Sequence, residues 1–168
     1  MIIGDPSTFA LCVDVVRQWN DDNHFNNGVL CLCVGGTFLP NNLVNATLNT
    51  DLYELIGQLE NVKEDADIFA MDRDSAFKSI YKLRFPEDYD IDNDYSYDIS
   101  PYSLSDNSYY VFAVMHEGRI RILGAKLRYI IEEGIHDLNE IDIAETYILV
   151  TELHEIVEQL KEYWHSIN

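Results

Sequence analysis

The stretch that decides the fold class covers residues 109–127, with the sequence YYVFAVMHEGRIRILGAKL. It holds two runs rich in β-branched and aromatic residues, 109–116 and 119–127, which are typical of strands. The dipeptide Glu117-Gly118 lies between them, and such a two-residue connection favours a tight β-hairpin. The stretch therefore predicts two antiparallel strands in the middle of the chain.

The second run also indicates which side chains face the core. Because successive residues of a strand point to opposite faces, Ile120 and Ile122 are predicted to point inward together. Arg119 and Arg121 alternate with them, so we expect both guanidinium groups to point outward.

An antiparallel meander is predicted before this hairpin. Residues 9–19 alternate between apolar and polar and indicate a half-buried strand, and residues 20–28 are rich in Asn and Asp and indicate a turn. Residues 29–34 are apolar on both faces, as in a central strand. A short strand over residues 37–39 follows and is expected to end at Pro40.

Three helices are predicted from apolar spacing. Residues 51–59 have the helical period, with Asn49 or Thr50 as candidate N-cap, and residues 75–83 form a second short candidate. A strand over residues 145–150 then precedes a closing helix with Thr151 as its expected N-cap. The apolar stripe of that helix consists of Leu153, Ile156, Val157, Leu160 and Trp164.

Together these elements predict one α+β domain over residues 1–168. Its antiparallel sheet would combine the meander with the central hairpin, helices would pack on one face, and an amphipathic helix would close the chain. A length of 168 residues suits a single hydrophobic core.

The composition excludes several classes of function. The chain has 30 Asp and Glu against 11 Lys and Arg, a formal net charge of −19, which disfavours direct binding to nucleic acid or to anionic membranes. A hydrophobic fraction of 47% is too high for an acidic disordered chain. The N-terminus has no signal-peptide pattern, and the three cysteines are an odd number, so we expect a cytoplasmic protein.

No pattern for catalysis or for a metal or cofactor stands out. The histidines lie outside known catalytic motifs, so we expect that the protein is not an enzyme. Cys31 and Cys33 lack further ligands at metal-binding spacing and are better explained as buried small residues. The acidic run that begins at Asp88 fails as a calcium loop, because Asn93 and Ile99 stand where glycine and glutamate belong.

Residues 86–107 predict a long loop in which aspartate and tyrosine are interleaved. Tyrosine offers contact area with a polar tip, and aspartate offers a carboxylate to Arg or Lys, so the loop suits a surface for a basic protein partner. The alternative is a solvated loop whose tyrosines cover the edge of the core, held by Arg119 and Arg121. The candidate contact residues are Asp88, Asp90, Asp92, Asp94, Tyr95, Tyr97, Asp98 and Tyr102.

Three stretches carry a family resemblance. They are residues 1–6 running into Phe9-Ala10, then Asn27-Gly28 with Gly36 and Pro40, and finally residues 47–49 with Leu52-Tyr53 and Leu55. With the layout of residues 145–164, this pattern resembles the immunity proteins of bacterial polymorphic-toxin and contact-dependent growth-inhibition systems, in particular the family numbered forty-two.

The resemblance implies a non-enzymatic inhibitor that binds and shields a cognate toxin domain. Because of the acidic surface we expect that toxin to be basic, and a nuclease fits this expectation. Two alternatives stay open: a nucleic-acid mimic that inhibits several DNA- or RNA-binding enzymes, and an enzyme with a carboxylate site. If the loop is not the interface, the next candidates are Glu152, Glu155 and Glu158.

Overall fold

The computed structural model describes residues 1–20, 26–88 and 90–168, and in these ranges the chain forms two main antiparallel sheets and a small third one. The first sheet has the order β1 (Ile2–Gly4), β2 (Phe9–Val15), β3 (Asn27–Val34) and β4 (Thr37–Leu39), and β5 (Ala46–Thr47) also pairs with β3. The second sheet has the order β10 (Ala144–Leu149), β7 (Arg119–Lys126) and β6 (Tyr109–His116). The third is a hairpin of β8 (Arg128–Ile130) and β9 (Ile135–Asp137).

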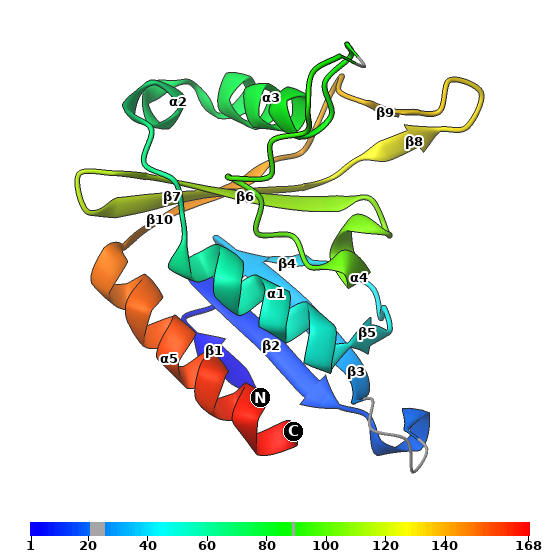
Figure 1. Cartoon of the computed structure of the whole chain (residues 1–168), viewed down its shortest axis with the longest axis vertical. Helices are drawn as coiled ribbons and strands as arrows, with labels where there is room; N and C mark the ends of the chain where they lie inside the picture. Colours follow the sequence, from blue (N-terminus) through cyan, green and yellow to red (C-terminus); the bar gives the residue numbers. More distant parts are fainter. Residues whose placement is uncertain (21–25, 89) are drawn as a thin grey trace.

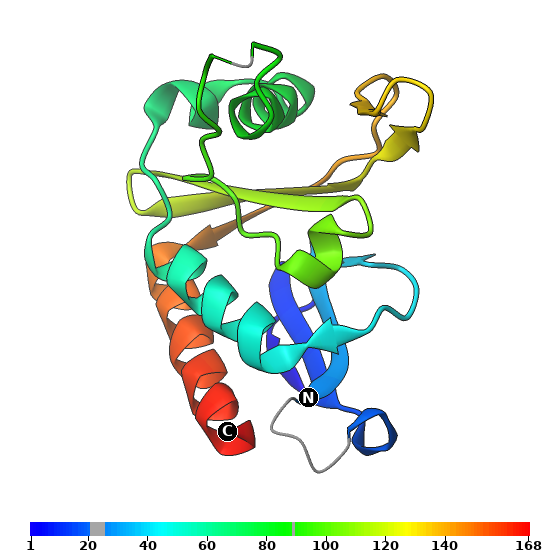
Figure 2. The ribbon, with the colours of Figure 1, turned by 45° about the vertical axis from the view of Figure 1, so that its right-hand side comes forward.

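Helices cover both main sheets. They are α1 (Leu48–Glu60), α2 (Ala66–Ala70), α3 (Arg73–Arg84), α4 (Tyr102–Ser105) and α5 (Val150–Ile167), and a single 3-10 turn, Arg17–Trp19, follows β2. Figures 1 and 2 show α1 and α5 side by side on the first sheet, with the second sheet crossing beyond their ends. Helices α2 and α3 lie on the far side of the second sheet, away from α1 and α5.

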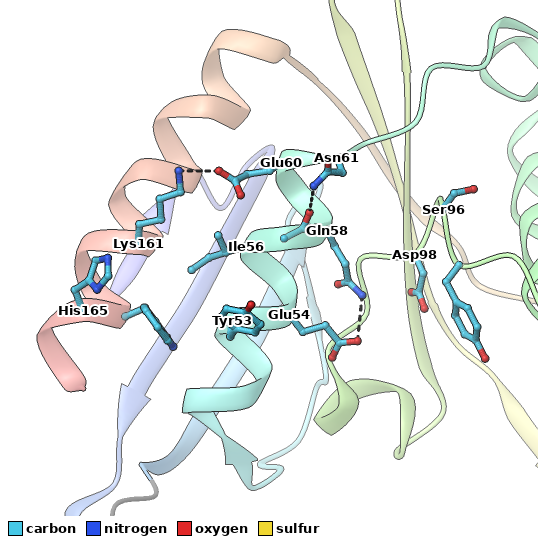
Figure 3. A pocket seen from close by; sticks show the side chains of 13 residues that line it. Tyr53, Glu54, Ile56, Gln58, Glu60, Asn61, Ser96, Asp98, Lys161 and His165 are labelled. Carbon is cyan, nitrogen blue, oxygen red and sulfur yellow. Dashed lines mark hydrogen bonds and ion pairs between the residues drawn. The ribbon is translucent and has the colours of Figure 1, made fainter.

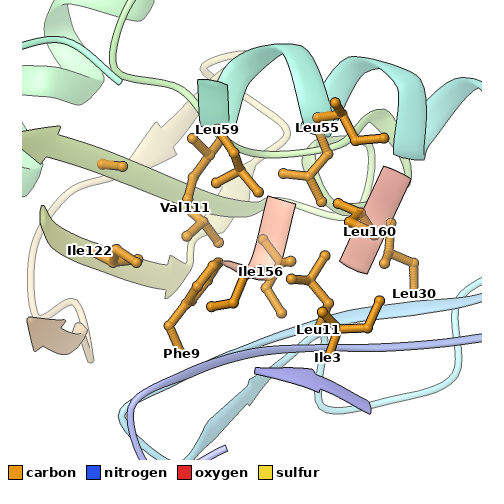
Figure 4. Close-up of a cluster of buried hydrophobic side chains, with 14 of the residues drawn as sticks. Ile3, Phe9, Leu11, Leu30, Leu55, Leu59, Val111, Ile122, Ile156 and Leu160 are labelled. Carbon is orange, nitrogen blue, oxygen red and sulfur yellow. The ribbon is translucent and has the colours of Figure 1, made fainter. Parts of the chain in front are cut away.

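Two hydrophobic clusters explain this layering. The larger one fills the space between the first sheet, α1, α5 and one face of the second sheet, and Figure 4 shows part of it. The smaller one lies on the opposite face of β6 and β7, under α2 and α3. Along β6, Val111 therefore packs into the larger cluster and its neighbour Phe112 packs into the smaller one. The second sheet is buried on both faces.

The two main sheets approach each other closely at two glycines. A Cβ on Gly124 of β7 would lie 2.4 Å from Cδ1 of Leu39, so a larger residue would force the Leu39 side chain of β4 to move. Gly35, in the turn between β3 and β4, has a φ of +53°, and a Cβ there would lie 2.7 Å from the carbonyl oxygen of Glu145.

Most of the expected elements are confirmed. The central hairpin forms with His116 opposite Arg119, and Glu117 and Gly118 both have positive φ, as a tight turn of this kind requires. The meander and the α+β class are also confirmed. The expected turn at residues 20–28 falls largely on residues 21–25, which lie outside the described ranges.

The arrangement of the sheets corrects one expectation. The meander and the hairpin belong to separate sheets, and helices cover both faces of the second sheet instead of one. As a consequence, the expected outward position of Arg121 is wrong, since the side chain is 2% exposed. Strand alternation correctly places Arg121 on the other face of β7 from Ile120 and Ile122. That face, however, is covered by α2 and is not exposed to solvent.

Helix and strand ends also differ from the expectations. Strand β2 ends at Val15, because the chain turns into the 3-10 helix before Trp19. The N-cap of α1 is Thr47, not Asn49 or Thr50, and that of α5 is Leu149, not Thr151. The Glu152 side chain accepts a 2.6 Å hydrogen bond from the backbone N–H of Leu149, which satisfies a free donor at the start of α5.

Candidate interaction surface

The acidic loop, residues 85–101, connects α3 to α4 and runs past the edge of β6 (Figure 1). Its second half is fixed like an added strand, since the N–H of Ile99 donates to the carbonyl of Val111 at 2.9 Å. The N–H of Ala113 donates in turn to the carbonyl of Tyr97, also at 2.9 Å. Apart from the single-turn helix α4, the expectation of a long irregular segment is confirmed within the described residues.

Two of the candidate residues, Asp98 and Tyr97, are buried and hold the loop against the rest of the domain. Asp98 is 5% exposed, is ion-paired with Arg84 of α3, and accepts a 2.9 Å hydrogen bond from the N–H of Ser100. Burial raises the pKa of the Asp98 carboxyl, and the Arg84 guanidinium opposes that shift. The Tyr97 ring is buried, and its hydroxyl donates to Oδ2 of Asp65 at 2.7 Å. Neither side chain faces solvent.

The tip of the loop presents its carboxylates to solvent. Asp88, Asp90 and Asp92 are exposed, and no ion pair joins them to another described residue. Ile91 lies among them and is 58% exposed. The backbone N–H of Asp90 donates to Oδ1 of Asp88 at 3.0 Å, which fixes the local turn. The tip therefore combines free negative charge with a hydrophobic side chain, as suits protein binding.

The remaining candidates lie farther along the loop. Asp94 forms an ion pair with Lys63 at 3.5 Å, and Tyr95 next to it is 54% exposed. Tyr102 is 57% exposed, but it begins α4, which lies on the other side of the second sheet from the tip (Figure 1). The structure thus groups Asp88, Asp90 and Asp92 at the tip and places Tyr102 apart from them.

The two hairpin arginines do not hold the loop. Arg121 bonds Oε1 of Glu145 at 2.7 Å and donates to the backbone carbonyls of Phe69 and Met71 at 3.0 and 2.7 Å. The Arg119 guanidinium stacks over the Tyr147 ring at 5.1 Å. Because Arg84 and Arg121 are both buried against carboxylates, neither offers positive charge to the surface.

A groove that the sequence did not reveal lies beside the loop. It has a volume of about 620 Å³ and follows the outer face of α1 (Figure 3). One wall comes from α5, with Lys161, Trp164 and His165, and the other comes from Tyr95, Ser96 and Asp98 of the acidic loop. Two residues in the sequence could have indicated the groove. Tyr53 and Gly57 lie on the polar side of α1, where a surface helix ordinarily carries charged or polar side chains.

The second group of acidic candidates, on α5, is partly engaged in contacts within the chain. Glu152 and Glu155 are exposed, but Glu152 caps the start of the helix. Glu158 forms an ion pair with Lys161 at 2.7 Å. Among the described residues, no helix is long and apolar enough to cross a membrane.

The comparisons with known proteins identify the family. The family model described as immunity protein 42 matches residues 1–163. The crystal structure of CdiI from Burkholderia dolosa AUO158 is similar, with a TM-score of 0.79 and 26% sequence identity. The match covers 97% of this chain and 99% of that one. A search of curated proteins returns no match. From the family model that spans nearly its whole length, the chain is a member of the immunity protein 42 family.

Proposed function

We propose that this protein binds and neutralises the toxin domain of its own contact-dependent growth-inhibition system and so protects the bacterium that makes it. The observation that carries the proposal is the family match over residues 1–163. The similar structure bears the name CdiI, which is given to immunity proteins of such systems. Protection then follows from complex formation in the cytoplasm, without a catalytic step by this chain.

The charge distribution supports a basic partner. A net charge of −19 produces a strongly negative field, and the exposed carboxylates of Asp88, Asp90 and Asp92 add to it at the loop tip. Such a field accelerates the encounter with a positively charged protein and repels nucleic acid. We therefore propose a basic toxin, with a nuclease as the class that fits best, and the loop tip as part of the contact surface.

Co-expression with the toxin domain encoded beside this gene tests the proposal. We expect the two proteins to co-purify, to associate at micromolar concentration in low salt, and to allow growth of cells in which the toxin alone is lethal. Absence of binding and of protection would reject the proposed function. Comparable binding to several unrelated basic nucleases would instead favour the nucleic-acid mimic, because a mimic does not select its cognate partner.

A further inference from the structure

The groove over α1 has an open floor at Gly57. A glycine in the middle of a helix is unfavourable relative to alanine, and this one has no local reason to be glycine. Its φ is not positive, and a Cβ built on it would meet no atom within 4 Å. What the missing side chain provides is space in the groove between its two walls.

Aromatic rings border that space on both sides. Tyr53 of α1 is 70% exposed and lies 6.0 Å, between ring centroids, from Trp164 of α5. The Trp164 indole donates to the backbone carbonyl of Asn49 at 3.1 Å, which holds the ring in place. Tyr95 belongs to the opposite wall and is also exposed. Tyrosine and tryptophan faces of this kind attract cations.

The carboxylates in the groove differ in their partners. Glu60 is neutralised by Lys161 at 2.7 Å, and Asp98 by Arg84. Glu54 has no ion-pair partner among the described residues, and its Oε1 only accepts a long, 3.5 Å hydrogen bond from Nε2 of Gln58. Oε2 of Glu54 and Oε1 of Gln58 are both buried and receive no hydrogen bond in the described structure. Two acceptors without donors therefore lie next to each other just below the surface of this groove.

The environment of Glu54 makes a cation favourable there. Burial raises the pKa of its carboxyl, the nearby carboxylates of Asp98 and Asp51 raise it further, and the Arg84 guanidinium opposes the shift only in part. A positive group that enters the groove would relieve this repulsion and, once the Glu54 and Gln58 side chains turn toward it, would supply the missing donors. The bound positive group would keep part of its hydration, because Tyr53 and Tyr95 are exposed at the rim of the groove.

We propose that the groove over α1 receives one arginine side chain of the toxin domain, whose guanidinium stacks on Tyr53 and Trp164 and donates to Glu54 and Gln58. Arginine fits better than lysine because its planar group stacks on aromatic rings and presents several donors in a fixed fork. The inference rests on the proposed function and makes it more specific. It adds a pocket that continues from the acidic loop through Tyr95 and Ser96.

The free protein can be tested first, with a small probe. We would titrate it with Nα-acetyl-arginine amide and, as an uncharged analogue of the same shape, Nα-acetyl-citrulline amide. The signals to follow by NMR are the amide of Gly57 and the indole of Trp164. We expect saturable shifts with arginine, with a dissociation constant on the order of millimolar, and no comparable shifts with citrulline. We also expect Gly57→Lys to abolish the arginine response, because its own ammonium occupies the groove.

The complex with the co-encoded toxin domain gives the second readout. Gly57→Lys should weaken binding by roughly tenfold or more, mainly through faster dissociation, as expected when a direct contact in an interface is lost. Gly57→Ala keeps the groove open and should bind like the wild type. Asn45→Lys adds the same charge at an exposed position of another loop and should have little effect. Helix content measured by circular dichroism confirms that each variant folds.

Both readouts have to agree with the proposal. Equal shifts with citrulline, or no saturable shift with arginine, would overturn it, and so would a Gly57→Lys variant that binds the toxin as the wild type does. These results would leave the proposed function intact if the wild-type complex forms. A wild-type protein that fails to bind the toxin rejects the proposed function, and with it the role assigned to the groove.

Discussion

The buried guanidinium of Arg121 should be one of the strongest single supports of the fold. It is 2% exposed, and it joins three elements: β7, β10 through Glu145, and the end of α2 through the carbonyls of Ile68, Phe69 and Met71. Replacement by methionine, which has a similar length, removes every one of these bonds. It leaves the Glu145 carboxylate with only the Tyr147 hydroxyl as a donor, and it removes the arginine donor from the carbonyls of Phe69 and Met71.

The structure allows the size of this effect to be worked out. Removing one partner of a buried ion pair costs about 3–5 kcal/mol, because the other charge stays behind unpaired. The Glu145 side chain is 24% exposed, so water recovers part of that loss, and we expect a decrease of about 3 kcal/mol in the free energy of unfolding for Arg121→Met. For a domain of this size, that corresponds to a fall of about 6–12 °C in Tm.

Urea unfolding followed by circular dichroism measures this change, and Arg119→Met is its matched control. Arg119 lies two residues earlier on the same face of β7, but it is exposed and contacts the Tyr147 ring at 5.1 Å. An exposed cation–π contact is worth about 0.5–1 kcal/mol, so the control should lose no more than that. If both variants lose the same free energy of unfolding, or if Arg121→Met loses less than about 1 kcal/mol, Arg121 does not hold α2 on the second sheet as described.

Two further predictions concern stability and pH. Asp51 is 2% exposed, its Oδ2 has no hydrogen bond among the described residues, and burial raises its pKa above the ordinary 3.8. Because the ionised form of Asp51 therefore opposes folding, Asp51→Asn should raise the free energy of unfolding more near pH 7 than near pH 3. An equal gain at both pH values, measured by urea unfolding, would contradict this. His136 lies between the Tyr81 hydroxyl at 2.8 Å and the Ser108 hydroxyl at 3.0 Å, and burial lowers its pKa below 6.5. The neutral His136 therefore stabilises the fold above about pH 6.5, and this stabilisation is lost as the pH falls. Between about pH 7 and pH 5, the free energy of unfolding should decrease less for His136→Gln than for the wild type.

The elements with strong periodicity could be predicted from the sequence. The stripe on α5 and the hairpin of β6 and β7 depend only on local sequence, and both are confirmed. The burial of Arg121 could not be predicted in this way. Alternation assigns a face, but whether that face is covered depends on α2, a helix of 5 residues that is too short to show a period.

The candidate site shows the same limit. Asp90 and Asp98 belong to one stretch of similar composition, yet one carboxylate is exposed and the other is buried against Arg84. The difference arises from the pairing of residues 97–99 with the edge of β6, a contact between segments distant in the sequence. The α1 groove likewise requires α5 and the loop to meet over α1, so composition alone did not reveal it.

The most direct test of the account is the association rate between this protein and its cognate toxin domain. We predict that Asp90→Lys/Asp92→Lys lowers this rate roughly tenfold in low salt, with the difference shrinking as salt screens the charges. Asp14→Lys/Asp142→Lys makes the same change in net charge at exposed positions elsewhere and should have a much smaller effect. Equal association rates for the two double variants would contradict the claim that the acidic loop tip meets the toxin.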